Sequence, residues 1–284
     1  MAKFVLSAFA DEISPDLTEQ VRTLKDLNLG FLDLRSVDGK NVKDLTDQEV
    51  AYIWETLDRN GIQVACIGSP VGKSPIDGPL YEALADLVRV IGIGKRLGTN
   101  RIRIFSFYPP NISTNARYDE YVDQAIRRLE RFIPLAEREG AVLLLENEKQ
   151  IVGDTVARCY RLVRSLAGKH FRFLWDPANF VQVGERKVTE DAWDILGREV
   201  GYVHIKDALL ADGSVVAAGE GQGQVRELLE QLNAAGYRGF LSLEPHLEQA
   251  GRDGGFSGPE KMAYAVQSLR SLMASVGIEE SPAL

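Results

Sequence analysis

Short apolar runs alternate with amphipathic stretches along this chain. Each run is bounded by turn residues, as expected of a strand buried in a parallel sheet. The runs predict eight strands, at residues 4–9, 31–35, 62–67 and 101–105 and in four later segments that end at Glu146, Asp176, Lys206 and Glu244. Helical periodicity separates the strands. Ser14 is expected to cap the first helix, which Pro15 begins, and Thr46 is expected to open a second helix that Gly61 ends.

The alternation of strands and helices determines the expected fold. Each crossover is long enough for a right-handed βαβ unit, and no linker of altered composition divides the chain. The sequence therefore predicts an α/β protein with a single (β/α)₈ TIM barrel, in one domain that spans residues 1–284. A doubly wound open sheet is the alternative, but the chain lacks the glycine-rich turn after its first strand that this fold uses.

Candidate metal ligands stand at the ends of four successive strands. The apolar runs stop at an acid or a histidine, namely at Glu146, Asp176, His204 and Glu244. In a barrel, these strand ends converge at one mouth. Three carboxylates and one imidazole suit a divalent cation such as Mn²⁺, Mg²⁺, Co²⁺ or Zn²⁺. Any one of these residues alone would be explained as a helix cap, but four together favour a metal site.

Further polar residues lie on the same side of the chain as three of these ligands. Glu148, Lys206 and His246 each follow a ligand by two residues and share its strand parity. His246 either orients a ligand, binds substrate or is a solvated loop residue. Lys206 is assigned to substrate binding. Schiff-base chemistry is disfavoured, because a lysine beside a bound cation and carboxylates has little reason to lose its proton.

Arg35 and Lys73 are predicted to bind the polar or anionic end of a substrate. Arg35 stands at the tip of the second strand, with Asp33 of the same parity, and Lys73 lies in the loop after the third strand. Both are expected at the mouth and outside the core. The alternatives are a structural pair of Asp33 with Arg35 and a solvated Lys73.

Two glycine-containing loops were considered as ligand sites. Residues 68–74, Gly-Ser-Pro-Val-Gly-Lys-Ser, are one residue too short for a phosphate loop, and Pro75 would interrupt the required N–H groups. ATP binding is therefore not expected. Residues 219–223, Gly-Glu-Gly-Gln-Gly, either let the backbone approach a ligand closely or serve as a flexible connector.

The composition narrows the class of partner. A formal net charge of −8 argues against a nucleic-acid partner, because phosphate backbones are bound mainly by clustered Lys and Arg. No apolar run approaches the roughly 18 to 20 residues of a membrane span, so a soluble, cytoplasmic protein is expected. Cys66 and Cys159 have neither disulfide nor metal-ligand spacing and are expected to be buried. A homo-oligomer remains possible.

The segments around these residues resemble one superfamily over essentially the whole chain. They are Phe9-Ala10-Asp11-Glu12, Leu144-Leu145-Glu146-Asn147-Glu148, Trp175-Asp176-Pro177-Ala178-Asn179-Phe180, His204-Ile205-Lys206-Asp207 and Leu243-Glu244-Pro245-His246. They are similar to an uncharacterised branch of the xylose isomerase-like sugar phosphate isomerase/epimerase superfamily. That superfamily includes ketose 3-epimerases, hydroxypyruvate isomerase, inosose dehydratase and endonuclease IV.

The resemblance implies a metal-dependent enzyme acting on a small keto sugar, sugar acid or polyol derivative. It implies one divalent ion, often Mn²⁺, bound by Glu146, Asp176, His204 and Glu244, with the two glutamates as acid and base on opposite faces of the substrate. Many relatives carry histidine where Asn179 stands, and an amide binds a hydroxyl but cannot carry a proton at neutral pH. An isomerase or epimerase is expected, with an inosose dehydratase-like lyase or a non-catalytic sugar-binding barrel as alternatives.

Overall fold

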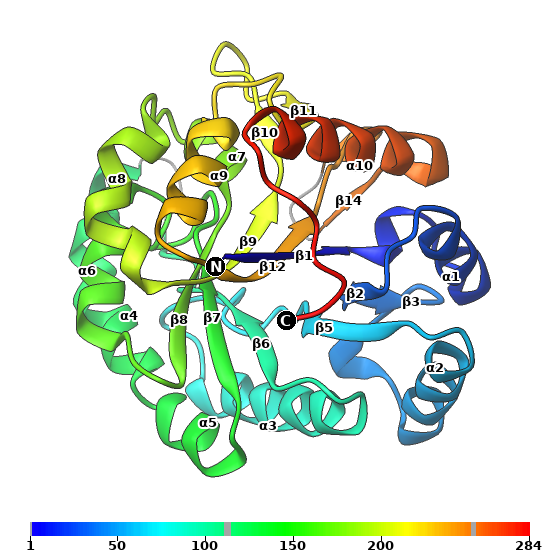
Figure 1. Cartoon of the computed structure of the whole chain (residues 1–284). Coiled ribbons are helices and arrows are strands. Elements are labelled where there is room, and N and C mark those ends of the chain that lie inside the picture. Colours follow the sequence, from blue (N-terminus) through cyan, green and yellow to red (C-terminus); the bar gives the residue numbers. More distant parts are fainter. Residues whose placement is uncertain (1, 111–114, 251–253) are drawn as a thin grey trace.

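Eight parallel strands form a barrel wall surrounded by helices (Figure 1). The computed structural model describes residues 2–110, 115–250 and 254–284. The wall strands are β1 (Lys3–Ala8), β2 (Phe31–Leu34), β5 (Gln63–Ile67), β6 (Arg101–Ile104), β7 (Val142–Glu146), β8 (Phe171–Trp175), β9 (Val200–Ile205) and β12 (Arg238–Leu243). Their order is β1-β12-β9-β8-β7-β6-β5-β2. A parallel bridge between Phe9 and Asp33 brings the two outer strands together, so the predicted TIM barrel is confirmed.

The helices lie outside this wall and follow the strands in sequence. They are α1 (Leu17–Asp26), α2 (Asp47–Arg59), α3 (Leu80–Arg96), α4 (Val122–Leu129), α5 (Ile133–Glu139), α6 (Val156–Leu166), α7 (Pro177–Gln182), α8 (Val188–Leu196), α9 (Val225–Ala234) and α10 (Gly258–Ser275). The predicted start of α2 is confirmed, because Thr46 and Glu49 form a reciprocal capping box. The predicted cap of α1 is wrong. Asp16 accepts a hydrogen bond from the Glu19 N–H, while the Ser14 hydroxyl accepts one from the Asp16 N–H.

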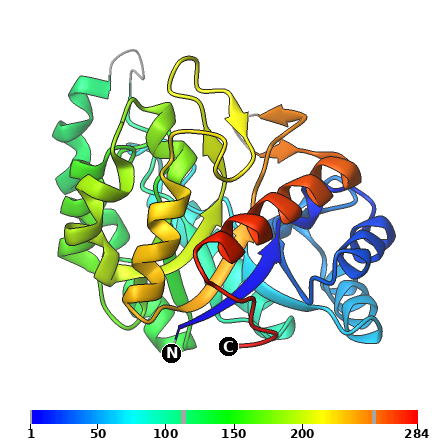
Figure 2. The ribbon, with the colours of Figure 1, turned by 45° about the horizontal axis from the view of Figure 1, so that its top comes forward.

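Several short elements were not predicted from the sequence. Between β6 and β7, the 3₁₀ turn η3 (Asn115–Tyr121) precedes α4 and α5. Short antiparallel pairs also stand on the barrel, and they are β3 (Ser36–Val37) with β4 (Lys40–Asn41), β10 (Asp207–Ala208) with β11 (Val215–Val216), and β13 (Gln249–Ala250) with β14 (Gly255–Phe256). Three more 3₁₀ turns are η1 (Ala10–Glu12), η2 (Val42–Asp44) and η4 (Gly197–Glu199). Figure 2 shows β10–β11 and β13–β14 at one end of the barrel and both chain termini at the other.

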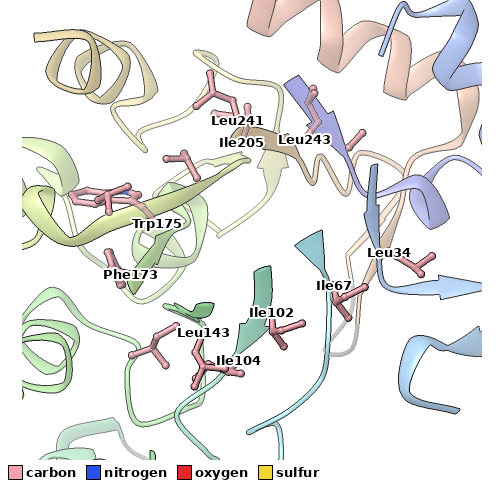
Figure 3. Close-up of a cluster of buried hydrophobic side chains, with 14 of the residues drawn as sticks. Leu34, Ile67, Ile102, Ile104, Leu143, Phe173, Trp175, Ile205, Leu241 and Leu243 are labelled. Atoms are coloured by element: carbon pink, nitrogen blue, oxygen red, sulfur yellow. The ribbon is translucent and has the colours of Figure 1, made fainter. Parts of the chain in front are cut away.

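Strand parity places neighbouring apolar residues of β7 in two different cores. Leu143 and Leu145 belong to the large core between the wall and the helices, which Figure 3 shows in part. Leu144 belongs instead to a smaller core that lines the barrel interior, and its members are Val5, Ala65, Cys66, Leu144, Leu174, Tyr202 and Phe240. Because side chains alternate along a strand, Glu146 points inward with Leu144. The same parity directs the other strand-end residues toward the barrel axis.

Both cysteines are buried, as expected from the sequence. Among the helices of the described residues, none combines the length and apolarity needed to cross a bilayer.

Candidate metal centre

The four predicted ligands come together inside the barrel mouth. Glu146 is the last residue of β7, Asp176 follows β8, His204 lies within β9, and Glu244 follows β12. None is more than 3% exposed. One donor atom from each lies within 4.8 Å of a donor atom from every other. Residues from four adjacent strands of the wall therefore form one compact donor set.

Local backbone chemistry fixes the orientation of Asp176. Its N–H donates to Asn147 Oδ1 at 2.9 Å, and Asn147 Nδ2 donates back to the Asp176 carbonyl at 2.8 Å. Asp176 also caps α7, since its Oδ1 accepts from the Asn179 N–H at 2.9 Å. One oxygen thus positions the carboxylate, and Oδ2 is left for the centre.

The donor set fits a divalent cation. Glu146 Oε2, Asp176 Oδ2 and His204 Nε2 are fully buried and take part in no hydrogen bond within the described ranges. Lys206 Nζ lies 2.8 Å from Asp176 Oδ2 and Arg103 Nη1 lies 3.3 Å from Glu146 Oε2, both without hydrogen-bond geometry. Buried oxygens without a well-aligned donor are costly, and a bound cation would satisfy them. Three carboxylates with one imidazole supply the hard and borderline ligands that Mn²⁺, Mg²⁺, Co²⁺ or Zn²⁺ accept.

Lys206 is the cation that lies nearest to two of the ligands. Its Nζ is 2.8 Å from Asp176 Oδ2 and 3.2 Å from Glu244 Oε2, and its side chain is buried. Burial alone would lower the pKa of Lys206, but these two carboxylates outweigh it and raise the pKa well above the ordinary value. In the absence of a metal ion, the amine therefore stays charged.

Arg35 joins Glu244 to two acids of the turn η1, Asp11 and Glu12. Its Nη1 donates to Glu244 Oε1 and its Nε to Asp11 Oδ2, at 2.9 and 2.8 Å, and its Nη2 lies 3.7 Å from Glu12 Oε1. Arg35 is at the mouth, as predicted, but it is only 4% exposed, so the expectation that it lies outside the core is wrong. The alternative pairing with Asp33 is not what the structure has, because Asp33 accepts from Ser7 and Tyr202 deeper in the barrel.

The charges of the ligands shift one another's pKa values. Burial alone would lower the pKa of His204, but Glu146 and Glu244 outweigh it and raise the pKa to about 10. Burial raises the pKa of Asp176 to about 6. Burial also acts to raise the pKa of Glu244, yet Lys206 and His204 hold it well below the ordinary value. In the absence of a metal ion, the imidazole therefore carries a proton between the two glutamates, with Nδ1 at 3.0 Å from Glu146 Oε1 and 3.4 Å from Glu244 Oε2.

His246 lies beside the centre and contacts the buried Glu12. Its ring Nε2 is 3.1 Å from Glu12 Oε1 and 3.6 Å from Glu244 Oε1, while its backbone N–H donates to Glu12 Oε2 at 2.8 Å. The backbone φ of His246 is 47°, and a Cβ on Gly255 would lie 1.9 Å from the imidazole ring. His246 is thus a buried, sterically fixed neighbour of a ligand, and the solvated-loop alternative does not hold.

Lys73 and Asn179 line the other sides of the mouth. Lys73 Nζ lies 3.2 Å from Glu148 Oε2 and 4.5 Å from the centroid of the Phe105 ring, so the solvated alternative is wrong. Asn179 Nδ2 donates to the Asn147 carbonyl at 2.9 Å and reaches Glu146 Oε1 at 3.5 Å. Its Oδ1 is buried and accepts no hydrogen bond from the described residues, which leaves an acceptor for a substrate hydroxyl.

The glycine-rich loop after β9 encloses a carboxylate of the chain itself. Asp207 accepts hydrogen bonds from the N–H groups of Gly219, Gly221 and Gly223 at 2.8 to 3.0 Å. A Cβ on Gly221 would lie 2.4 Å from Asp207 Oδ1 and 2.4 Å from the Ala208 carbonyl, so glycine is needed for this close approach. Residues 219–223 are therefore neither a ligand loop nor a flexible connector, because their N–H groups bind Asp207 of the same chain.

Two residues of the site were missed in the sequence. Arg103, on β6, reaches Glu146 and Glu244, and Glu12, in η1, holds His246. Arg103 had a usable signal, because a charged residue interrupts an apolar strand at the parity of the inward-facing residues. Glu12 gave no comparable sequence signal, because it follows the first strand in a turn, where acidic residues are common.

Comparisons with known proteins agree with the fold. The family model described as the xylose isomerase-like TIM barrel matches residues 21–272. Among solved structures, a D-tagatose 3-epimerase-like protein superposes with a TM-score of 0.73 and 18% identity, over 97% of this chain and 98% of that one. The probable 3-DHS dehydratase AsbF from Bacillus anthracis gives 0.70 and 14%, over 95% and 98%. An uncharacterized protein of Methanocaldococcus jannaschii is 21% identical over 206 residues, 70% of each chain.

Proposed function

The chain belongs to the xylose isomerase-like TIM barrel family, and we propose that it is a divalent-metal-dependent isomerase or epimerase of a small keto sugar or its derivative. The proposal assigns the metal to Glu146, Asp176, His204 and Glu244, with Mn²⁺ as the first candidate. It assigns proton transfer to Glu146 and Glu244. The structural likeness to a D-tagatose 3-epimerase-like protein and to a probable dehydratase supports sugar chemistry of this kind.

The observation that supports the proposal most is the arrangement of the two glutamates. Both reach the same imidazole nitrogen of His204 from different strands, and both reach the same Nη1 atom of Arg103. They therefore converge from two sides on one small, buried space at the mouth. A carboxylate on each side of a bound ketose can remove a proton from the carbon next to the carbonyl and return it from the other side.

The remaining groups have roles that follow from their positions. A bound divalent ion would supply Lewis acidity that lowers the cost of forming an enediolate. Asn179 would accept a hydrogen bond from a substrate hydroxyl through its unpartnered Oδ1. Lys206, which stays protonated beside Asp176 and Glu244, would stabilise negative charge that develops on a substrate oxygen.

Solvent deuterium distinguishes this proposal from its alternatives. Purified protein loaded with Mn²⁺ is incubated in D₂O with a panel of keto sugars, keto acids and cyclic polyols, and the products are followed by NMR and mass spectrometry. We expect deuterium at the carbon next to the carbonyl, without loss of water. Glu146→Gln and Glu244→Gln should abolish the exchange, because an amide keeps roughly the carboxylate shape but cannot accept the proton.

Other outcomes correspond to other functions. A dehydratase would exchange the same position but would accumulate a product lighter by one water, whereas hydride transfer would give an isomer without solvent label. A binding protein would be stabilised against heat by its ligand while the ligand stays unchanged. Full turnover by both Gln variants would show that these glutamates are not the acid and base.

A further inference from the structure

Arg103 is a buried cation that the proposed reaction does not yet use. It lies on β6 between Ile102 and Ile104, which belong to the outer core, and so points toward the barrel axis. Only 4% of the residue is exposed. A charged side chain that is fully buried needs partners, and burying it without a role is costly.

Two backbone carbonyls and two aromatic rings hold the guanidinium of Arg103, and none of these groups depends on a metal ion or a substrate. Nη2 donates to the Gly68 carbonyl at 3.1 Å, and Nε donates to the Ser69 carbonyl at 3.4 Å. The guanidinium carbon also lies 5.0 and 4.9 Å from the ring centroids of Phe9 and Phe105. The loop that superficially resembles a phosphate loop thus presents carbonyl oxygens to an arginine, the opposite polarity to that needed for ATP.

Nη1 is the atom of Arg103 that faces the reaction space. It lies 3.3 Å from Glu146 Oε2 and 3.5 Å from Glu244 Oε1, and neither contact has hydrogen-bond geometry. A rigid donor is therefore held between the two proposed proton-transfer groups. A substrate group bound by Nη1 would therefore lie next to the carbons on which Glu146 and Glu244 are proposed to act.

Once a metal ion is bound, the other charged groups of the mouth balance one another, and Arg103 has no carboxylate left to balance its charge. The three ligand carboxylates would be balanced by a divalent ion together with Lys206. Arg35 has Asp11 as its second close partner, Lys73 has Glu148, and Glu12 is held by His246. Among the described residues of the mouth, Arg103 then carries the positive charge that a substrate would have to compensate.

The geometry points to a substrate that carries a carboxylate close to its keto group, bound by Arg103 Nη1. This inference rests on the proposed function and narrows its substrate class to keto sugar acids. One uncompensated guanidinium with one available edge matches a singly charged carboxylate, whereas a phosphate dianion would need a second cation. Arg103 is thereby assigned as a specificity-determining residue.

Sugars that differ at one carbon test the inference directly. D-fructose, 2-keto-D-gluconate, D-fructuronate and fructose 1-phosphate carry an alcohol, a carboxylate next to the ketone, a carboxylate at the far end, or a phosphate. Affinities for Mn²⁺-loaded protein are measured by calorimetry. We expect 2-keto-D-gluconate to bind at least about tenfold more tightly than the other three, a ratio that corresponds to about 1.4 kcal/mol.

Substitutions show whether the preference for 2-keto-D-gluconate comes from Arg103 or from the metal ion. Arg103→Met should remove the preference for 2-keto-D-gluconate over D-fructose in the Mn²⁺-saturated protein, and Arg103→Lys should retain part of it. Arg101→Met is the matched control. Arg101 has the same parity on the same strand but lies over the Phe240 ring at 5.0 Å, away from the metal ligands, and its loss should leave the preference intact.

Failure of this inference is distinguishable from failure of the proposed function. Equal binding of acid and alcohol by the wild type, or a preference that survives in Arg103→Met, would overturn the carboxylate assignment. Metal-dependent deuterium exchange into a neutral ketose would then still support the isomerase proposal. Conversely, an Arg103-dependent preference for the acid without exchange in any sugar would support the binding site while contradicting the proposed reaction.

Discussion

The two halves of the barrel mouth are built in different ways. The ligand half, at the ends of β7, β8, β9 and β12, contributes three carboxylates, His204 and Lys206. The arginine half, at the ends of β1, β2, β5 and β6, is organised by cations that alternate with aromatic rings, in the order Lys73, Phe105, Arg103, Phe9 and Arg35, with separations of 4.5 to 5.0 Å.

This difference separates two tasks. In the ligand half, Glu146 Oε2, Asp176 Oδ2 and His204 Nε2 take part in no hydrogen bond with the described residues, so that half can accept an ion. In the arginine half, cation–π contacts and hydrogen bonds already satisfy most of each guanidinium, so that half is rigid before substrate arrives. Substitutions in the first half should therefore change metal affinity, and substitutions in the second should change stability or substrate selectivity.

The largest effect on metal affinity is expected at Glu244, which belongs to the ligand half but is contacted by residues of both halves. Glu244→Gln should weaken Mn²⁺ binding by more than about 100-fold, because a direct ligand is changed and Lys206 loses a counter-charge. His246→Ala, which removes only a neighbour of the ligand, should cost about 10- to 100-fold. Calorimetric titration with Mn²⁺ measures both. A Gln variant that binds Mn²⁺ like the wild type would contradict the assignment of the donor set.

An effect on stability, rather than on metal affinity, is expected at Arg35. Arg35→Met should reduce the free energy of unfolding by about 3 to 5 kcal/mol, because Asp11, Glu12 and Glu244 lose a buried counter-charge. Arg22→Met, which removes an exposed ion pair with Glu19, is the control and should cost about 1 kcal/mol or less. Denaturant unfolding of the metal-free proteins measures the difference. Equal losses in the two variants would show that Arg35 contributes no more to stability than an exposed ion pair does.

The same division explains what could be predicted from the sequence. The ligand half was found because each of its strands ends abruptly in an acid or histidine, and parallel strands place those ends at one edge. Parity within β7 was equally readable, since Leu144 and Glu146 share the inward face. The barrel itself followed from alternation of strand and helix patterns, which depends on local sequence.

The arginine half depends on contacts between residues distant in sequence. Arg103 is held by carbonyl groups more than 30 residues earlier in the chain, at Gly68 and Ser69, and no local pattern indicates which way those carbonyls point. Burial of Arg35 was missed for the same reason, because the β13–β14 hairpin that covers it comes from the far end of the chain and its Gly255 carbonyl accepts from Arg35 at 3.5 Å. The Asp207 clamp was also hidden, since its glycines resemble an ordinary flexible loop.

A pH titration provides the smallest expected effect and the sharpest contrast between the halves. The pKa of His204 is raised to about 10, so in the metal-free protein the imidazole is protonated at neutral pH. A metal ion binds only the deprotonated ring, and one proton should therefore be released for each ion bound. Mn²⁺ affinity should rise about tenfold, or about 1.4 kcal/mol, for each unit between pH 7 and 8.

Mn²⁺ affinity should depend more steeply on pH below pH 6, whereas substrate binding at Arg103 should not depend on pH. Burial raises the pKa of Asp176 to about 6, so below that pH a second proton competes with the ion, and affinity should fall by more than tenfold per unit. Arginine stays protonated throughout this range, so binding of 2-keto-D-gluconate to the Mn²⁺-saturated protein should be flat between pH 7 and 8. Calorimetry in buffers of different ionisation enthalpy counts the released protons. Mn²⁺ binding without proton release would mean that Glu146 and Glu244 do not hold a proton on His204, and the ligand half would then be organised by Lys206 alone.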